Sequence, residues 1–230
     1  MDGINPIELA LSKTNMNIGI IGSGNMGSAL GTIWAKKGHQ VIFSYSRDPA
    51  KLEAIAAAAG ANAQVGTPEE AVKSSDVVLI TLQPFVLEEV LSPVGSWENK
   101  VVLTCMSGLK PDFTGHTVGI ATDLKISVAE QLAKLVSGAK VVEAFNVTFA
   151  EILASDSRQF GSEYPTVFYC GEDAQAKAIA AQLIQDCGYD AIDAGGLMVS
   201  RSLETLATAW VQFAVASNLF PNVGLKVLRR

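Results

Sequence analysis

A glycine-rich turn near the start of the chain has the residue types and the spacing that bind a dinucleotide. Gly22, Gly24 and Gly27 follow an apolar stretch at 17–21 and precede an amphipathic stretch. In this pattern the first glycine permits the tight turn, the second lets backbone amides approach a pyrophosphate, and the third lets the helix pack against the strand. The sequence therefore predicts a dinucleotide site over residues 22–27.

The end of the second predicted strand indicates which dinucleotide binds. An NAD site usually has Asp or Glu there to accept hydrogen bonds from the ribose, whereas this chain has Ser-Tyr-Ser-Arg at 44–47. Hydroxyls and a guanidinium suit the extra phosphate of NADP. Asp48 precedes a proline and fits the N-cap of the next helix instead. We therefore expect NADP(H), with Ser44, Ser46 and Arg47 at the phosphate, the alternative for Arg47 being a solvated loop charge.

Groups suited to acid–base or metal chemistry are scarce. His39 precedes the second predicted strand, at the end of the sheet opposite the cofactor, where we expect a structural role. His116 lies on the crevice side and is a candidate catalytic residue, or else a surface histidine. Asn146 is the other candidate, because its amide could bind a carboxamide or a carbonyl, or cap a helix starting at Thr148. Lys110 fits a solvated loop, and the sequence has no Ser/His/Asp set and no metal-ligand spacing. Hydride transfer, which depends on alignment more than on an ionisable side chain, is compatible with this inventory.

Composition excludes other classes of function. The 23 acidic and 17 basic residues give a net charge of −6, and no Lys/Arg cluster is interleaved with aromatics, so nucleic-acid binding is disfavoured. The three cysteines sit in or beside apolar segments without metal-binding spacing, which favours buried thiols. Residues 1–16 lack the pattern of a secretory signal, and 203–220 is interrupted by polar residues and fits a buried helix. We therefore expect a cytoplasmic protein without a membrane span.

Strands and helices alternate in the order of a doubly wound sheet. We expect an α/β Rossmann fold with a mainly parallel sheet, and ligand-facing residues just after the carboxyl ends of the strands. The expected strands are 17–22, 40–45, 62–65, 76–82, 100–105 and 140–145, and the expected helices are 25–37, 49–60, 67–74, 84–92 and 123–137.

The pattern changes after residue 146. We expect a lead-in at 1–16, a dinucleotide domain at 17–146 and a small C-terminal α/β unit at 147–230. Its expected helices are 148–154, 173–187 and 198–219, with strands at 166–170 and 189–193. This unit has too few elements to bury a core alone, so it must pack on the first domain or on a partner subunit. The apolar residues of 205–220 favour a homodimer joined through that helix.

Several segments together resemble the NADP-dependent deazaflavin (coenzyme F420) oxidoreductases. They are 20–30, the strand end at 46–47, the Lys-Val-Val-Glu-Ala-Phe-Asn segment at 140–146, Asp-Ala-Gly-Gly-Leu at 193–197, 201–204 and 225–230. The resemblance implies a homodimeric enzyme that exchanges a hydride between NADPH and a flat deazaflavin or flavin ring.

The resemblance also implies roles for individual residues. The pyrophosphate would be held by Ser23, Asn25 and Met26, and the extra phosphate by Ser46, Arg47 and Lys51. The nicotinamide would be lined by Leu82, Gln83, Ala144, Asn146 and Leu197. The crevice rule adds an acceptor pocket bounded by Gln83, Pro84, Met106, Ser107, Gly108 and Asn146. The resemblance extends that pocket to Gly195, Gly196 and Leu197.

One departure from the family leaves the acceptor open. Residues 104–108 are Thr-Cys-Met-Ser-Gly, where the family commonly has an Asp-x-x-Asn-Pro-like sequence beside the acceptor. The glycine turn is also similar to that of pyrroline-carboxylate and imine reductases, which makes a small-substrate reductase the first alternative. A non-enzymatic NADP(H)-sensing module is the second.

Overall fold

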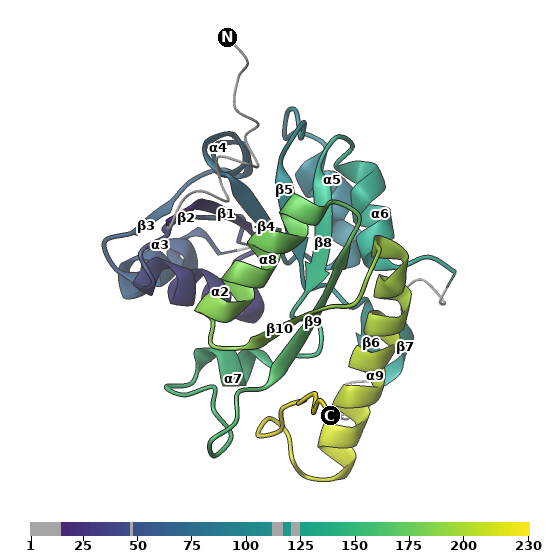
Figure 1. The fold of residues 1–230 in the computed structure, drawn as a ribbon. Coiled ribbons are helices and arrows are strands. Elements are labelled where there is room, and N and C mark those ends of the chain that lie inside the picture. The colour runs from purple at the N-terminus through teal and green to yellow at the C-terminus, as the bar shows by residue number, and fades with distance from the viewer. Residues whose placement is uncertain (1–14, 47, 112–116, 121–124) are drawn as a thin grey trace.

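One mostly parallel sheet organises the protein (Figure 1). The computed structural model describes residues 15–46, 48–111, 117–120 and 125–230. Within them, eight strands form a sheet of order β10-β9-β8-β5-β4-β1-β2-β3, in which all neighbours are parallel except β8 and β9. The strands are β1 (Asn17–Ile21), β2 (Gln40–Ser44), β3 (Ala63–Val65), β4 (Val77–Ile80), β5 (Val101–Thr104), β8 (Lys140–Ala144), β9 (Thr166–Gly171) and β10 (Asp190–Asp193). The predicted Rossmann-like α/β fold is confirmed.

Helices cover both faces of the sheet, because its central strands are apolar on both sides. One face packs α2 (Asn25–Lys36), α3 (Pro49–Ala59) and α8 (Ala174–Asp186). The other packs α4 (Pro68–Ser74), α5 (Leu87–Leu91) and α6 (Val128–Leu135). The remaining helices are the short 3-10 turns η1 (Pro84–Val86) and η2 (Leu197–Val199), α7 (Ala150–Ala154) and α9 (Ser200–Ala216).

Local sequence signals fix where several helices begin. The Asp48 carboxylate accepts from Ala50 N at the start of α3, so its predicted role as N-cap is confirmed. Thr67 with Glu70 and Ser127 with Glu130 form capping boxes at α4 and α6. Each box satisfies backbone N–H groups that a helix start leaves unpaired.

The segment after residue 146 shares a core with the rest of the chain. β9 pairs with β8 and extends the same sheet, and α8 packs on the α2 face. Trp34 of α2 donates its Nε1–H to Leu183 O at 3.0 Å, and its ring meets Phe145 edge-on, as Phe145 in turn meets Tyr189. These contacts join residues far apart in the sequence around one hydrophobic cluster.

Two features differ from the sequence expectation. The segment after β5 forms an antiparallel pair, β6 (Leu109–Pro111) and β7 (Thr117–Ile120), where no strand is predicted. These strands are short and contain a proline or a glycine, so their sequence does not show the apolar periodicity by which a strand is predicted. The expectation of a buried helix over 203–220 is wrong on one side, since Phe213 of α9 is 62% exposed.

No helix in the described part of the chain has the length and apolar character needed to cross a membrane.

His39 and the cysteines have the structural roles that the sequence predicts. The buried His39 ring accepts from Met16 N at Nδ1 (3.0 Å) and meets Asp186 through Nε2 (3.1 Å), which ties β2 to α8. Cys105, Cys170 and Cys187 are free and buried. Burial raises the pKa of Cys105 and of Cys170 to about 12, so both thiols are neutral at physiological pH.

Candidate functional site

The three glycines of the turn have different surroundings. A Cβ at Gly27 would lie 2.1 Å from Gly22 O, and a Cβ at Gly22, whose φ is +104°, would lie 2.9 Å from the Thr81 carbonyl. The Thr81 hydroxyl closes the turn by donating to Gly22 O. A Cβ at Gly24 would meet nothing within 4 Å. Gly22 and Gly27 are therefore packing positions, whereas Gly24 faces open space and leaves room for a ligand.

The start of α2 suits an anion. Gly24 is its N-cap, no side chain caps the helix, and its first turn contains no acidic residue. The unpaired N–H groups and the positive end of the helix dipole therefore point out beside Asn25 and Met26. Ser23 lies on the other side of the turn, because its buried hydroxyl donates to Ser44 O (3.3 Å) and its N–H to Tyr45 O (3.1 Å).

The end of β2 provides only part of the predicted phosphate site. Ser44 is fully buried and donates its hydroxyl to Ile20 O at 2.8 Å, so it serves the sheet. Ser46 is half-buried and accepts from Asp48 N, and Lys51 is exposed on α3. Arg47 lies outside the described residues. Among the predicted phosphate ligands with described side chains, Ser46 and Lys51 are therefore accessible.

A cleft of about 840 Å³ opens from this turn along the carboxyl ends of β1, β4, β5 and β8. The position agrees with the rule that parallel α/β sheets bind ligands beyond the carboxyl ends of their strands. It brings together ten of the predicted site residues: Gly24, Asn25, Met26, Leu82, Gln83, Pro84, Met106, Ser107, Gly108 and Asn146.

The far wall of the cleft consists of residues that sequence reasoning did not assign to the site. They come mainly from α9 and the loop before α7: Val147, Thr148, Phe149, Ala150, Ala207, Trp210, Val211, Val215 and Phe220, together with Thr81, Cys105 and Leu109. The α9 members recur at the spacing of one helix face, and that apolar face is the signal that could have identified them.

The turn at 195–197 does not line the cleft. Strand β9 is antiparallel to β8, and β10 is parallel to β9. Gly171 at the end of β9 donates its N–H to Gly195 O and pairs with Val142 in the middle of β8. The turn after β10 therefore lies away from the carboxyl end of β8, where the cleft opens. Leu197 N donates to Glu172 Oε1 at 2.9 Å, and a Cβ at Gly196 would lie 2.8 Å from that same oxygen. Gly196 therefore packs against Glu172, whereas a Cβ at Gly195 would lie 3.6 Å from Val199 Cγ2. Ala144 is also absent from the lining and fully buried.

Asn146 is held at the edge of the cleft by a carboxyl group. Its Nδ2 donates to Glu143 Oε1 at 2.8 Å, and its backbone carbonyl accepts from the Ser107 hydroxyl at 3.3 Å. The alternative that Asn146 caps the next helix is wrong, because α7 begins after Phe149. Its amide is therefore positioned for a ligand.

The described lining of the cleft contains one titratable side chain, Cys105, whose thiol is neutral. His116 lies outside the described residues, and the side chain of Lys110 is not described. Hydride transfer, which depends on the alignment of its reactants, is compatible with this described lining.

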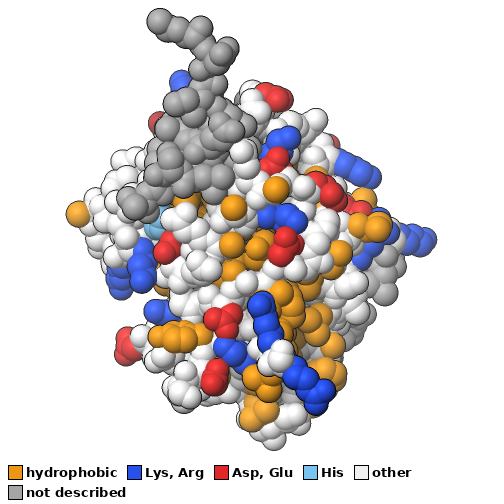
Figure 2. Space-filling model, viewed as in Figure 1, with side chains coloured by type: hydrophobic (Ala, Val, Ile, Leu, Met, Phe, Trp, Pro, Cys, Tyr) orange, Lys and Arg blue, Asp and Glu red, His pale blue; other side chains and the backbone are white. Residues whose placement is uncertain are grey.

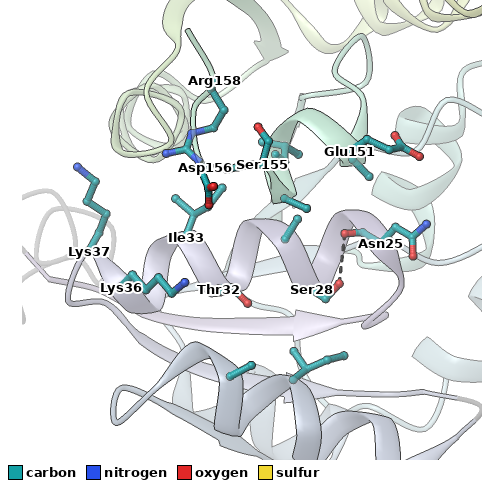
Figure 3. A pocket seen from close by; sticks show the side chains of 16 residues that line it. Asn25, Ser28, Thr32, Ile33, Lys36, Lys37, Glu151, Ser155, Asp156 and Arg158 are labelled. Carbon is teal, nitrogen blue, oxygen red and sulfur yellow. Dashed lines mark hydrogen bonds between the residues drawn. The ribbon is translucent and has the colours of Figure 1, made fainter. Parts of the chain in front are cut away.

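A second hollow, of about 640 Å³, lies between α2, α3 and α7 (Figure 3). Its rim mixes the cations Lys36, Lys37 and Arg158 with the anions Glu151 and Asp156. It follows the outer side of α2 and not the strand ends, so we place the site in the larger cleft.

Sequence comparison relates part of the chain to a family of NADP-dependent oxidoreductases. Residues 17–108 match the sequence model of the family described as NADP oxidoreductase, coenzyme F420-dependent, so the predicted resemblance is confirmed over that segment. Over 194 residues, 84% of this chain, the sequence is 26% identical to metalloreductase STEAP3 of Rattus norvegicus, and it spans 37% of the length of that relative.

Solved structures share the fold. A protein of Arthrobacter sp. FB24, provisionally assigned as an F420-dependent NADP reductase, superposes with a TM-score of 0.78 at 22% identity, covering 94% of this chain and all of that one. A reductive aminase from Aspergillus terreus, in complex with NADPH4, cyclohexanone and allyl amine, gives a TM-score of 0.61 at 21% identity, covering 89% of this chain and 64% of that chain.

Proposed function

We propose that the chain binds NADPH along the glycine turn and transfers its hydride to a flat ring held against the α9 wall of the cleft. One observation carries the proposal. A single cleft of about 840 Å³ joins the uncapped start of α2 to an apolar wall that contains Trp210. Pockets of roughly 300–1,000 Å³ with a few polar groups among apolar ones are typical of small-molecule sites.

The cofactor residues follow from which groups are accessible. The N–H groups at Asn25 and Met26 would hold the pyrophosphate, and Ser46, Lys51 and Arg47 the extra phosphate. Leu82, Gln83 and Asn146 would lie along the nicotinamide. The open space at Gly24 supports this placement, because a dinucleotide there contacts backbone without displacing a side chain.

The acceptor end suits an aromatic heterocycle with carbonyl groups, such as a deazaflavin or a flavin. Met106, Phe149 and Trp210 provide polarisable and aromatic surface, and Gln83 and Asn146 provide amides. The Trp210 Nε1–H is buried and has no hydrogen-bond partner among the described residues. A ring carbonyl would give that N–H the acceptor it lacks.

Transfer would be direct. When bound, NADPH supplies a hydride, which is a proton with two electrons, and becomes NADP⁺, while the proton that completes reduction of the ring comes from water. The chain would align the two rings, and none of the described lining residues is required as a general acid.

The test is to follow NADPH and NADH oxidation with four acceptors: coenzyme F420, FMN, a ferric chelate and a cyclic imine. We expect NADPH to be oxidised with the deazaflavin or the flavin, and NADH to be a much poorer donor. Turnover of the imine alone would replace the proposal with a small-substrate reductase. NADPH binding without any turnover would indicate a sensing module.

We further infer that the chain forms a homodimer through the outer side of α9. Hydrophobic side chains gather over the region of α9 and the C-terminal segment (Figure 2). Phe213 is 62% exposed there and Leu219 50%. Exposed apolar surface of this kind marks contact sites. Sedimentation velocity at micromolar concentration should give a dimer, and Phe213→Glu should give a monomer. A monomeric parent protein would contradict the inference.

A further inference from the structure

Two buried carboxyl groups meet behind the cleft. Glu143 on β8 and Glu204 on α9 are both fully buried. Glu204 Oε1 accepts from Val128 N at 2.6 Å and Ala129 N at 3.3 Å, at the start of α6. Glu143 Oε1 accepts from Asn146 Nδ2 at 2.8 Å. One oxygen of each carboxyl group is therefore already an acceptor.

Each carboxyl group has a second oxygen that lacks a donor. Glu143 Oε2 and Glu204 Oε2 are buried and have no N–H or O–H donor among the described residues. The carboxyl groups nevertheless lie within hydrogen-bonding reach of each other. Two ionised carboxylates would repel each other there, and each oxygen would lack a donor. A single proton between the two oxygens satisfies both.

The surroundings favour keeping that proton on Glu143. Burial, followed by the neighbouring Glu204, raises the pKa of Glu143 well above its ordinary value. Burial also raises the pKa of Glu204 to about 7, while the N–H groups of Ala129 and Val128 favour its ionised form. Glu204 has the N–H donors, so it is the member of the pair that carries the charge above about pH 7.

The neighbouring groups do not replace the proton. The thiols of Cys105 at the end of β5 and Cys170 on β9 interact with Glu143 and are neutral. Glu130 of α6, which acts on Glu204, is paired with Arg201 through two hydrogen bonds of 2.7 Å. The Arg201 guanidinium is thus already bound to another carboxylate.

We propose that Glu143 and Glu204 are a positioning pair for the proposed hydride transfer, and that their shared proton fixes both the Asn146 amide and the α9 wall. The proposal rests on the proposed function for its effect on turnover. Glu143 holds Asn146 by its Nδ2, which leaves the Asn146 oxygen to accept from a ligand N–H. Glu204 connects α9 to α6 and to β8. It lies on α9 within two helical turns of Ala207 and Trp210, which line the cleft.

Glu143→Gln provides a matched test, because glutamine resembles the protonated acid. Its carbonyl can accept from Asn146 and its NH₂ can donate to Glu204. We expect Glu143→Gln to keep NADPH affinity and turnover within about threefold of the parent, whereas Glu143→Ala should lower turnover roughly tenfold to a hundredfold by releasing Asn146. Equal losses in the two variants would overturn the proposal.

Thermal unfolding against pH tests the proton itself. The folded protein retains a proton that unfolded glutamate releases near its ordinary pKa of about 4.3, so parent stability is lost as pH rises above that value toward the raised folded pKa. Glu143→Gln has no such proton to lose. The Tm of Glu143→Gln minus the Tm of the parent should therefore increase as the pH is raised from about 5 to about 9. A constant difference across this range would overturn the proposal.

The double variant Glu143→Gln, Glu204→Gln is the strictest test. Each glutamine must turn its carbonyl toward Asn146 or α6, so the two NH₂ groups would face each other without an acceptor. We expect its Tm loss to exceed the sum of the single losses, and an additive result would contradict the shared proton. These measurements need no acceptor, so failure of the proposed function in the acceptor assay is distinguishable from failure of the pair.

Discussion

Alanine at Gly27 should abolish NADPH binding and destabilise the fold, whereas alanine at Gly24 should leave the fold intact. A Cβ at Gly27 would lie 2.1 Å from Gly22 O and 2.8 Å from Thr81 Oγ1, so the turn or α2 would have to move. Such overpacking typically costs about 1–3 kcal/mol. At Gly24 nothing lies within 4 Å, and the methyl group would occupy only ligand space. Thermal unfolding and NADPH titration measure the two effects separately.

Gly24→Asp extends the comparison to charge. Its carboxylate would stand at the uncapped start of α2, where the pyrophosphate is proposed to bind. We expect NADPH affinity to fall by roughly a hundredfold or more, since a like charge and a steric block act together. The Tm should not fall, because Asp is a good N-cap. Unchanged NADPH affinity in Gly24→Asp would move the cofactor away from this turn.

Much of the fold could be predicted because the signals are local. A strand that is apolar throughout, such as β4, must be buried on both faces, and Asp48 before a proline must begin a helix. The strand ends then define the cleft, so the predicted residues at 82–84 and 106–108 lie together.

The parts that could not be predicted depend on distant partners. The apolar face of α9 shows that something covers it, but the pattern does not say whether that is a second copy or a cleft in the same chain. The antiparallel placement of β9, which removes Gly196 from the cleft, is decided by sheet pairing. Glu143 stands in an apolar strand, and its partner Glu204 is 61 positions further along the chain. No periodicity connects two such residues.

Replacing Trp210 should separate acceptor binding from cofactor binding. Trp210→Ala removes the largest apolar surface of the α9 wall, so we expect kcat/KM for the acceptor to fall by roughly a hundredfold, about 2.7 kcal/mol. NADPH affinity should remain within about threefold, because the glycine turn is at the other end of the cleft. Steady-state kinetics with varied acceptor and NADPH titration by fluorescence measure the two quantities.

Trp210→Phe then tests the unpartnered N–H. Phenylalanine keeps an aromatic surface and removes Nε1–H, which is buried and lacks a partner among the described residues. If a ring carbonyl binds that N–H, KM for the acceptor should rise about tenfold while Tm is unchanged or higher, since a buried group without a partner has been removed. Thr205→Ala, at an exposed position of the same helix, is the control and should change neither quantity. Equal losses of acceptor turnover and NADPH affinity in Trp210→Ala would show that the α9 wall belongs to the cofactor site, because a residue that contacts only the acceptor cannot weaken NADPH binding in its absence.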